Sequence, residues 1–443
     1  MTHFTQVFLP KQLIALMALF AFLAIGTSSS FAVNIQTVTS PSGVKALLVE
    51  DYTVPIVSIS VSFKGGASQD PEDKEGLLRL LSTMLDEGAG RYDNKVFQAR
   101  VEELGVEMGF GAGRDAFTGR LRTLASEVDN AFEMFRLALN EPRFDAEPID
   151  RMKTALITRL VRSKKNPNHL AGVAMRDALF AGHAYSRPVS GTEESLAKLN
   201  RDDLVEIHRK LFARDNLKIG VVGAISAEKL GFMLDTLFGS LPEKAELRPI
   251  PEIVPKFGKK IDVVLDAPQT SISLVYPGLK RSDKDFFAAH LMNHVLGGGS
   301  FSSRLYNEVR EKRGLAYSVY SGISTYDHAA ILTSGTGTRN DRADEALKVI
   351  KSEIAKMAKD GPTNEELIAA KKYVIGTYAI SNLDTSTKIA SVLVAIQDAD
   401  LGIDYIDQRE GYISSVTRED VQRIAKQLLS VEPTIVKVGP KAS

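Results

Sequence analysis

The sequence predicts an α+β protein with two homologous lobes, each an antiparallel sheet with helices packed on one face, joined by a proline-containing linker. Three pairs of similar segments recur in the same order. The matching pairs are 55–65 with 268–278, 130–135 with 345–350, and 217–223 with 435–439. The first two pairs are offset by 213 and 215 residues. A period this long indicates a duplicated domain, because solenoid repeats span only about 20–50 residues.

The amino terminus has the pattern of a secretory signal. Lys11 precedes an apolar run over 13–25, and the small-residue stretch that follows ends in Ser30-Phe-Ala32, a small-x-small cleavage pattern. The run of 13 residues is short for a membrane span. We therefore expect residues 1–32 to be a signal peptide and the mature chain to reside in a bacterial periplasm. A retained amino-terminal anchor is the alternative.

The lobes are expected at 33–241 and 261–443. Each contains an alternating strand that ends at a glycine and is followed by an acidic stretch and an apolar helix, predicted over 75–87 in the first lobe and 286–296 in the second. Neither lobe shows the regular strand–helix alternation of a parallel sheet. The linker at 242–260 begins at a proline, and Pro249, Pro251 and Pro255 within it interrupt every periodic pattern.

Composition excludes several classes of function. Lysine plus arginine and aspartate plus glutamate both number 55 in the 443 residues, so no net charge favours nucleic acid or acidic lipid. The absence of cysteine excludes disulfides, thiolate metal sites, a cysteine nucleophile and a cysteine-linked lipid anchor. We expect no nucleic-acid partner and no stable membrane insertion.

The most informative stretch is 297–317. Gly297, Gly298 and Gly299 follow the apolar helix of the second lobe and indicate a helix end and a loop of close approach. A short helix is predicted from about 302 to 312, and a strand over 315–325 with Tyr317, Val319 and Ser321 on one side.

This arrangement places Arg310 on the last turn of a helix and Tyr317 near the start of the next strand. The turn between them can bring guanidinium and phenol to one point. Both groups donate hydrogen bonds, which suits a carbonyl oxygen that becomes negative during a reaction. The alternative is an ordinary helix–turn–strand connection with a surface arginine and a half-buried tyrosine.

These motifs resemble the pitrilysin/insulinase family of zinc peptidases, in particular the two-lobed subunits similar to mitochondrial processing peptidase and its bacterial relatives. The most specific motifs are GGGSFSSRL at 297–305 and VREKRGLAY at 309–317, supported by segments at 140–145, 187–195 and 215–223. The resemblance covers essentially the whole mature chain. It implies two similar lobes per subunit, subunits that pair to enclose a peptide chamber, and a substrate-binding role for the three glycines.

The chain departs from the family pattern at the zinc-binding residues. Active members carry His-x-x-Glu-His on the first helix of the amino-terminal lobe, where two histidines ligate zinc and the glutamate activates water. The matching positions here are Arg79, Ser82 and Thr83, none of which replaces a zinc ligand or the base. The segment that matches the distal glutamate ligand offers Thr158 and Arg159. We expect no zinc site at these positions and no peptide hydrolysis by this chain alone.

A second pair of histidines is a candidate for metal binding. His290 and His294 lie four residues apart on the helix that the duplication makes equivalent to the zinc helix. No carboxylate stands between them and no third ligand is specified, so we interpret them as packing residues.

The resemblance implies that Arg310 and Tyr317 face the zinc of a partner and bind the scissile carbonyl. The predicted function is the non-catalytic, substrate-binding subunit of a heterodimeric periplasmic zinc endopeptidase acting on peptides. This chain would need no cofactor, and zinc would belong to a homologous partner that carries the zinc box. The alternative is a catalytically dead peptide-binding or scaffold protein of the cell envelope.

Overall fold

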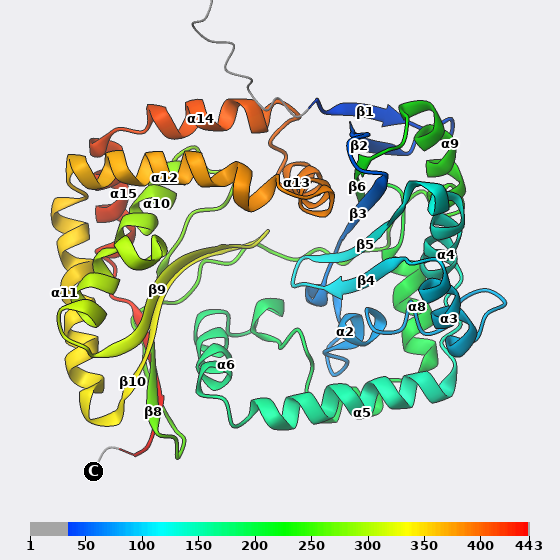
Figure 1. The fold of residues 1–443 in the computed structure, drawn as a ribbon. Coiled ribbons are helices and arrows are strands. Elements are labelled where there is room, and N and C mark those ends of the chain that lie inside the picture. Colours follow the sequence, from blue (N-terminus) through cyan, green and yellow to red (C-terminus); the bar gives the residue numbers. More distant parts are fainter. Residues whose placement is uncertain (1–33, 442–443) are drawn as a thin grey trace, which may run out of the picture. The chain divides into compact units, whose positions relative to one another are not determined.

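The computed structural model describes residues 34–441, so the predicted signal peptide at 1–32 lies outside the described residues. From Ile35 onward the chain forms one unit by its internal contacts. Two sheets with helices make up two lobes, which confirms the predicted two-lobed α+β fold (Figure 1). None of the helices in the described part is long and apolar enough to cross a membrane.

The first sheet has the strand order β1-β2-β6-β3-β5-β4. Its strands are β1 (Gln36–Thr39), β2 (Lys45–Glu50), β3 (Ile56–Lys64), β4 (Glu107–Ala112), β5 (Ala116–Leu124) and β6 (Leu217–Gly223). Neighbouring strands run antiparallel except β2 and β6, which are parallel. The sheet is therefore mixed rather than fully antiparallel, because the chain closes the lobe by inserting β6 between β2 and β3.

The second sheet repeats this plan with the order β7-β11-β8-β10-β9. Its strands are β7 (Lys260–Val264), β8 (Gln269–Pro277), β9 (Ala316–Thr325), β10 (Ala330–Arg339) and β11 (Thr434–Gly439). The last strand again lies between two earlier ones and pairs in parallel with β7. In both sheets, the strand at the far edge from the parallel pair, β4 or β9, belongs to a hairpin.

Helices of each lobe cover one face of its own sheet. In the first lobe they are α2 (Leu77–Leu81), α3 (Asn94–Glu103), α4 (Val128–Asn140), α5 (Ala146–Ser163), α6 (Pro167–Leu179), α7 (Glu193–Lys198), α8 (Arg201–Leu211) and α9 (Ala227–Phe238). In the second they are α10 (Phe286–Asn293), α11 (Ala343–Asp360), α12 (Asn364–Asn382), α13 (Ser386–Asp398), α14 (Tyr405–Ser415) and α15 (Arg418–Leu429). Two of these helices, α6 and α13, do not follow that rule.

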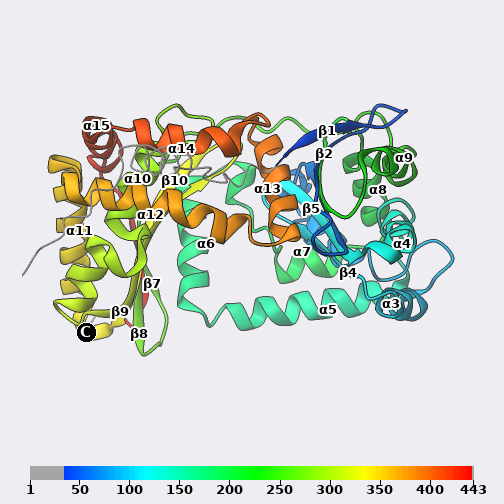
Figure 2. The ribbon, with the colours of Figure 1, turned by 45° about the horizontal axis from the view of Figure 1, so that its top comes forward.

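The lobes exchange one helix each, so helices do not pack on one face only. Helix α13 of the second half lies against β6 and β3, on the face of the first sheet opposite α4, α8 and α9 (Figures 1 and 2). Helix α6 of the first half lies against β11 and β8 of the second sheet. Each sheet therefore has helices on both of its faces.

The exchange explains the serines that alternate with apolar residues in the central strands. Residues 57–63 of β3 are all buried, although the strand alternates valine, isoleucine or phenylalanine with serine. Ser58 Oγ lies 2.9 Å from Ser386 Oγ on α13, and Ser271 Oγ of β8 donates to Asn168 Oδ1 on α6 at 2.8 Å. Ser58 and Ser271 are thus buried but hydrogen-bonded, as most buried polar groups are, whereas the buried Oγ of Ser62 has no partner among the described residues.

The connection from 242 to 259 contains no regular helix or strand. Ile253 N donates to His328 O at 3.1 Å, and Lys256 N donates to Leu179 O at 3.1 Å. Backbone hydrogen bonds to both lobes therefore hold the proline-containing segment in place. The lobe boundaries at 241 and 261 stay predictions.

Candidate functional site

Tyr317 lies at a β-bulge on edge strand β9. Val319 pairs with Thr336 and Ala316 pairs with Thr338, so Tyr317 and Ser318 together oppose a single residue of β10. The bulge breaks the alternation, and the predicted common face of Tyr317, Val319 and Ser321 is wrong. Val319 and Ser321 are buried, whereas Tyr317 is 82% exposed. A bulge redirects a side chain in this way at an edge strand.

Arg310 lies between two aromatic rings. Its guanidinium carbon is 4.7 Å from the ring centroid of Tyr306 and 4.7 Å from that of Tyr317. The Nη1 of Arg310 also donates a hydrogen bond to the hydroxyl of Tyr306. The structure therefore brings Arg310 and Tyr317 together across the turn between them. Cation–π contact with both rings holds the guanidinium over the exposed phenol.

The predicted helix over 302–312 is irregular. It begins with a 3-10 turn, Ser300–Ser302, and ends as a π-helical turn, Tyr306–Glu311, which carries Arg310. Glu308 accepts from Lys312 Nζ at 2.6 Å and from Arg313 Nη1 at 2.6 Å, and these two cations lower the pKa of the Glu308 carboxyl. π-helical turns often occur at functional sites because they displace a side chain from the regular helical position.

The three glycines have different environments. A Cβ on Gly297 would lie 2.6 Å from Ser321 Oγ and 2.7 Å from Ser321 N, so Gly297 allows the helix end to pack directly against β9. Gly299 is buried beside His294, and Gly298 is exposed. The apolar helix itself ends at Asn293 and continues as the π-helical turn His294–Gly298. The substrate-binding role of these glycines stays a prediction.

An anchor that sequence reasoning did not single out is Arg304. Its Nε donates to Glu366 Oε1 at 2.7 Å and its Nη2 to Glu366 Oε2 at 2.5 Å, a two-point ion pair between the motif and α12. Nη2 also donates to Gly361 O at 3.0 Å. Fork-shaped pairing of this kind orients both partners. The sequence signal that could have identified Arg304 is its position inside the SSRL motif at 302–305.

The positions that match the zinc box do not suit zinc. Ser82 Oγ donates to Arg79 O and Thr83 Oγ1 donates to Leu80 O, both at 2.8 Å. These bonds to carbonyls three residues earlier compete with helix hydrogen bonds, and α2 ends at Leu81, so the predicted helix over 75–87 is too long. Zinc prefers histidine, thiolate and carboxylate donors, and none of these side chains is present at positions 79, 82 and 83.

The positions that match the distal glutamate ligand, 158 and 159, do not suit zinc either. Thr158 and Arg159 are exposed on α5, and Thr158 Oγ1 donates to Thr154 O at 2.8 Å. Within residues 34–441, no group of three or more histidine, aspartate or glutamate side chains is placed to hold a metal ion.

His290 and His294 each lie against an aromatic ring. His290 stacks on Phe286 with ring centroids 6.0 Å apart, and His294 lies 5.0 Å from the ring of Tyr373. Burial lowers the pKa of His290 to about 4, aided by the positive charge of Arg409. Burial also lowers the pKa of His294. These contacts support the interpretation of the pair as packing residues.

The structure does not join the two halves of the expected site within this chain. No hydrogen bond, ion pair or ring contact in the described part of the chain links Arg310 or Tyr317 to Arg79, Ser82 or Thr83. Arg310 and Tyr317 belong to the edge of the second sheet, whereas the zinc-box positions follow β3 of the first.

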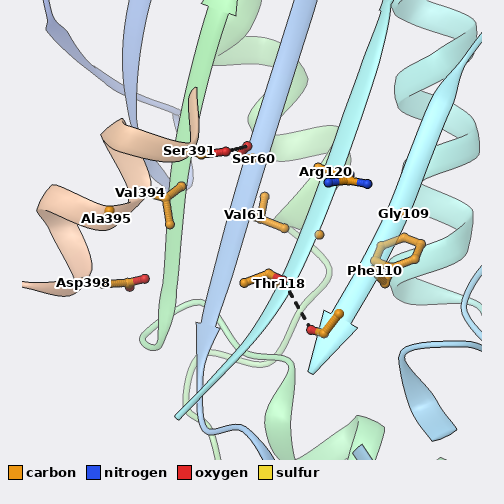
Figure 3. Close-up of a pocket in the computed structure, with 12 residues that line it drawn as sticks. Ser60, Val61, Gly109, Phe110, Thr118, Arg120, Ser391, Val394, Ala395 and Asp398 are labelled. Carbon is orange, nitrogen blue, oxygen red and sulfur yellow. Dashed lines mark hydrogen bonds between the residues drawn. The ribbon is translucent and has the colours of Figure 1, made fainter. Parts of the chain in front are cut away.

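A cavity of about 460 Å³ lies on the face of the first sheet that α13 covers in part. Figure 3 shows its lining from β3, β5 and β4 on one side and from Ser391, Val394, Ala395 and Asp398 of α13 on the other. Gly109 and Gly111, which lie opposite Arg120 and Thr118 on the neighbouring strand, add no side chain to its lining. Sequence reasoning missed this cavity, although the GFGAG pattern at 109–113 was a signal for a strand with one bare face.

Two family models match the chain in tandem. Residues 45–193 match the model described as insulinase (peptidase family M16), and residues 198–374 match the model described as peptidase M16 inactive domain. Together they span more than half of the sequence.

Individual relatives agree with this assignment. The Helicobacter pylori protein "Non-peptidase homolog YmxG" is 26% identical over 349 residues, covering 78% of this chain and 80% of the relative. The Bacillus subtilis protein "Uncharacterized zinc protease YmxG" is 24% identical over 417 residues, covering 92% and 99%. The crystal structure of a peptidase M16 inactive domain from Pseudomonas fluorescens matches with a TM-score of 0.87 and 29% identity, covering 93% of this chain and 98% of that one.

Proposed function

The chain belongs to the insulinase (M16) peptidase family as an inactive-type homologue, and on this premise we propose that it is the substrate-binding subunit of a two-chain zinc endopeptidase. The partner is a homologous chain that carries the zinc box. The complex works in the periplasm and cleaves peptides. The zinc box of the partner would hold the zinc, which would supply the Lewis acid for the scissile carbonyl and for the attacking water.

The observation that carries this proposal is the placement of Arg310 between Tyr306 and Tyr317 in a chain without zinc donors at 79, 82 and 83. A scaffold has no use for an exposed phenol beside a preorganised guanidinium. A peptidase does, because the carbonyl oxygen becomes negative as water attacks. The two donors stabilise that oxygen more strongly in the transition state than in the bound peptide.

The exposure of Tyr317 fits a role opposite another chain. A side chain that is 82% exposed at an edge strand has few contacts of its own to satisfy. Closure of the dimer would remove water from this surface and strengthen its hydrogen bonds to a substrate oxygen. Extended peptides would gain further affinity by adding a strand to a sheet edge.

Reconstitution tests the proposal. The purified chain is mixed with the homologous zinc-box chain from the same organism, and cleavage of a fluorogenic peptide and size-exclusion profiles are measured for each chain and for the mixture. We expect a heterodimer and activity only in the mixture. Separate species with no gain in activity would favour the alternative, a peptide-binding scaffold of the cell envelope.

A further inference from the structure

A second cavity, of about 400 Å³, lies where α5 meets α6, at the corner visible in Figures 1 and 2. Its walls come from the end of α5, from α6, from the loop at 186–193 and from Arg114 in the turn between β4 and β5. None of the candidate site residues lines it. Its lining includes two arginines, Arg114 and Arg176.

Both guanidinium groups are half-buried without a counter-ion. In residues 34–441, neither Arg114 nor Arg176 has a carboxylate oxygen within 4.0 Å. The Nε of Arg176 is shielded from solvent and has no hydrogen-bond partner among these residues. Burial lowers the pKa of both groups, and the positive charge of Arg114 lowers the pKa of Arg176 further. Two adjacent, desolvated cations destabilise the free protein unless an anion joins them.

The structure holds Arg114 in place. Arg114 lies between the rings of Tyr185 and Tyr326, 5.2 and 5.8 Å from their centroids, and its Nη1 donates to Tyr185 O at 2.8 Å. Arg176 lies beside Gly172 one turn earlier on α6, where a Cβ would be 3.4 Å from Nη1. The guanidinium of Arg114 is therefore oriented before any ligand arrives, which lowers the entropy cost of binding.

The remaining charges of the lining do not neutralise the two arginines. Lys164 and Glu193 pair with each other at 2.5 Å. Asp177 is exposed, and it raises the pKa of Arg176 but offsets the effect of burial only in part. His169 has a pKa lowered by burial and by Arg176, so it is neutral at pH 7 and has an N–H to donate.

Part of the lining is apolar. It consists of Leu160, Val173, Pro188 and Val189. A free inorganic anion would leave this surface uncovered, whereas an anionic group that carries an aliphatic side chain would contact both walls. Cavities of about 300–1,000 Å³ are the usual size for small ligands.

We propose that this cavity binds a carboxylate attached to an aliphatic group, with the C-terminal residue of a peptide as its natural form. Arg114 and Arg176 donate to the carboxylate oxygens, and the aliphatic side chain packs on Leu160 and Val173. The inference rests on the proposed function only in taking the ligand to be a peptide.

Calorimetric titration of the purified protein tests it. The probes are a nonapeptide ending in leucine with a free carboxylate, the same peptide with a C-terminal amide, N-acetyl-leucine and inorganic phosphate. We expect the acid to bind at least about tenfold more tightly than the amide, since 1.4 kcal/mol corresponds to tenfold. N-acetyl-leucine should bind and phosphate should bind more weakly than either acid. Equal affinity for acid and amide, or tightest binding of phosphate, would overturn the proposal.

Variants locate the binding. Arg176→Met should weaken acid binding about tenfold or more, whereas Arg162→Met, on the exposed side of α5, should leave it unchanged. The melting temperature of free Arg176→Met should equal or exceed that of the parent, because a repelled buried cation is removed. A structural arginine would give a lower melting temperature. Val173→Phe fills the cavity without changing charge and should also weaken binding; unchanged affinity in both variants would refute the site.

The outcomes separate this inference from the proposed function. Peptide affinity that depends neither on the C-terminal group nor on Arg176 would show that the cavity does not bind peptide C-termini. It would leave the proposed subunit role unaffected. Binding of N-acetyl-leucine without binding of any peptide would establish the cavity as a carboxylate site and contradict the peptide-binding role.

Discussion

The two lobes share one plan but have kept different chemistry. In each, a buried central strand, β3 or β8, leads into an apolar helix, α2 or α10, and the hairpin beyond it supplies the edge strand. After β3, the zinc-box positions carry arginine, serine and threonine. After β8, the chain holds Arg310 against Tyr317. The apolar pattern therefore maintains the fold, while the polar positions on and after the apolar helix are free to change.

The contact with the exchanged helix also differs between the lobes. In the first sheet, the strand supplies the small residue: a Cβ on Gly220 of β6 would lie 2.4 Å from Ala390 O of α13. In the second sheet, the helix supplies it, because Ala171 of α6 packs on Val436 of β11. The same close approach of helix and strand is therefore reached by opposite choices of residue size.

The largest effect is expected from Tyr317→Phe, which removes the hydroxyl and keeps the ring over Arg310. In the reconstituted enzyme, kcat should fall by about 10²–10³, or roughly 3–4 kcal/mol, with little change in KM. Steady-state kinetics on a fluorogenic peptide measures this. Tyr320→Phe, on the same exposed strand, is the control and should retain activity. A kcat within about twofold of the parent would make Tyr317 a packing residue.

Arg310→Lys should cost less. It keeps the charge but loses the planar fork and its stacking between two rings, so both binding and turnover should suffer. We expect kcat/KM to fall by the equivalent of roughly 1.5–3 kcal/mol, the range for a hydrogen bond to a charged group. The control is Arg313→Lys, because Arg313 is a surface residue that pairs with Glu308. If both variants behave alike, the guanidinium has no special role in the reaction.

Gly220→Ala tests the close packing of α13 on β6 in the first lobe. The added Cβ would collide with the Ala390 carbonyl, which cannot move without shifting α13. Overpacking of this kind typically costs about 1–3 kcal/mol. Urea unfolding measures the loss. Gly376→Ala in α12, where nothing lies within 4 Å of a new Cβ, is the matched control and should be neutral or stabilising. Equal stability of both variants would show that α13 does not pack rigidly on β6.

His290 should make stability depend on pH. Its folded-state pKa of about 4 lies below the ordinary histidine value of 6.5, so the unfolded chain takes up the proton first as pH falls. Its contribution is complete above pH 6.5 and is lost progressively toward pH 4, by up to roughly 3 kcal/mol at about 1.4 kcal/mol per pKa unit. Urea unfolding at pH 7.5 and pH 4.5 should show a smaller loss for His290→Gln than for the parent. Parallel losses would mean that His290 is solvated.

The smallest effect concerns zinc in the isolated chain. Because neither helix presents a complete donor set, the protein purified alone should contain well under one equivalent of zinc by atomic absorption. The double variant His290→Ala, His294→Ala should give the same value. Stoichiometric zinc that disappears in the double variant would establish these histidines as a metal site and reverse their interpretation.

The features of the site that depend on residues close together in the chain were predictable from the sequence. The spacing of Arg310 and Tyr317 across a short turn indicated that they meet, and the structure places them 4.7 Å apart from guanidinium to ring centroid. The way they meet was not predictable. Strand alternation puts Tyr317 on the face of Val319 and Ser321, but the bulge opposite Gly337 turns it outward. A bulge depends on the pairing of two strands, and one strand's pattern does not contain it.

Side-chain periodicity and the internal repeat were enough to determine two α+β lobes, because burial on one face of a helix or strand leaves a local pattern in the sequence. The same sequence also established that the zinc-box residues are missing, since that is a matter of identity at known spacing. Only the tertiary structure decided that each sheet has a parallel pair and that α6 and α13 cover the sheets of the opposite lobes. The serines of β3 and Ser271 of β8 alternate with apolar residues as solvent-facing residues do, yet they are buried under a helix that lies elsewhere in the chain. Contacts between distant segments depend on how whole elements pack, and no local pattern records that.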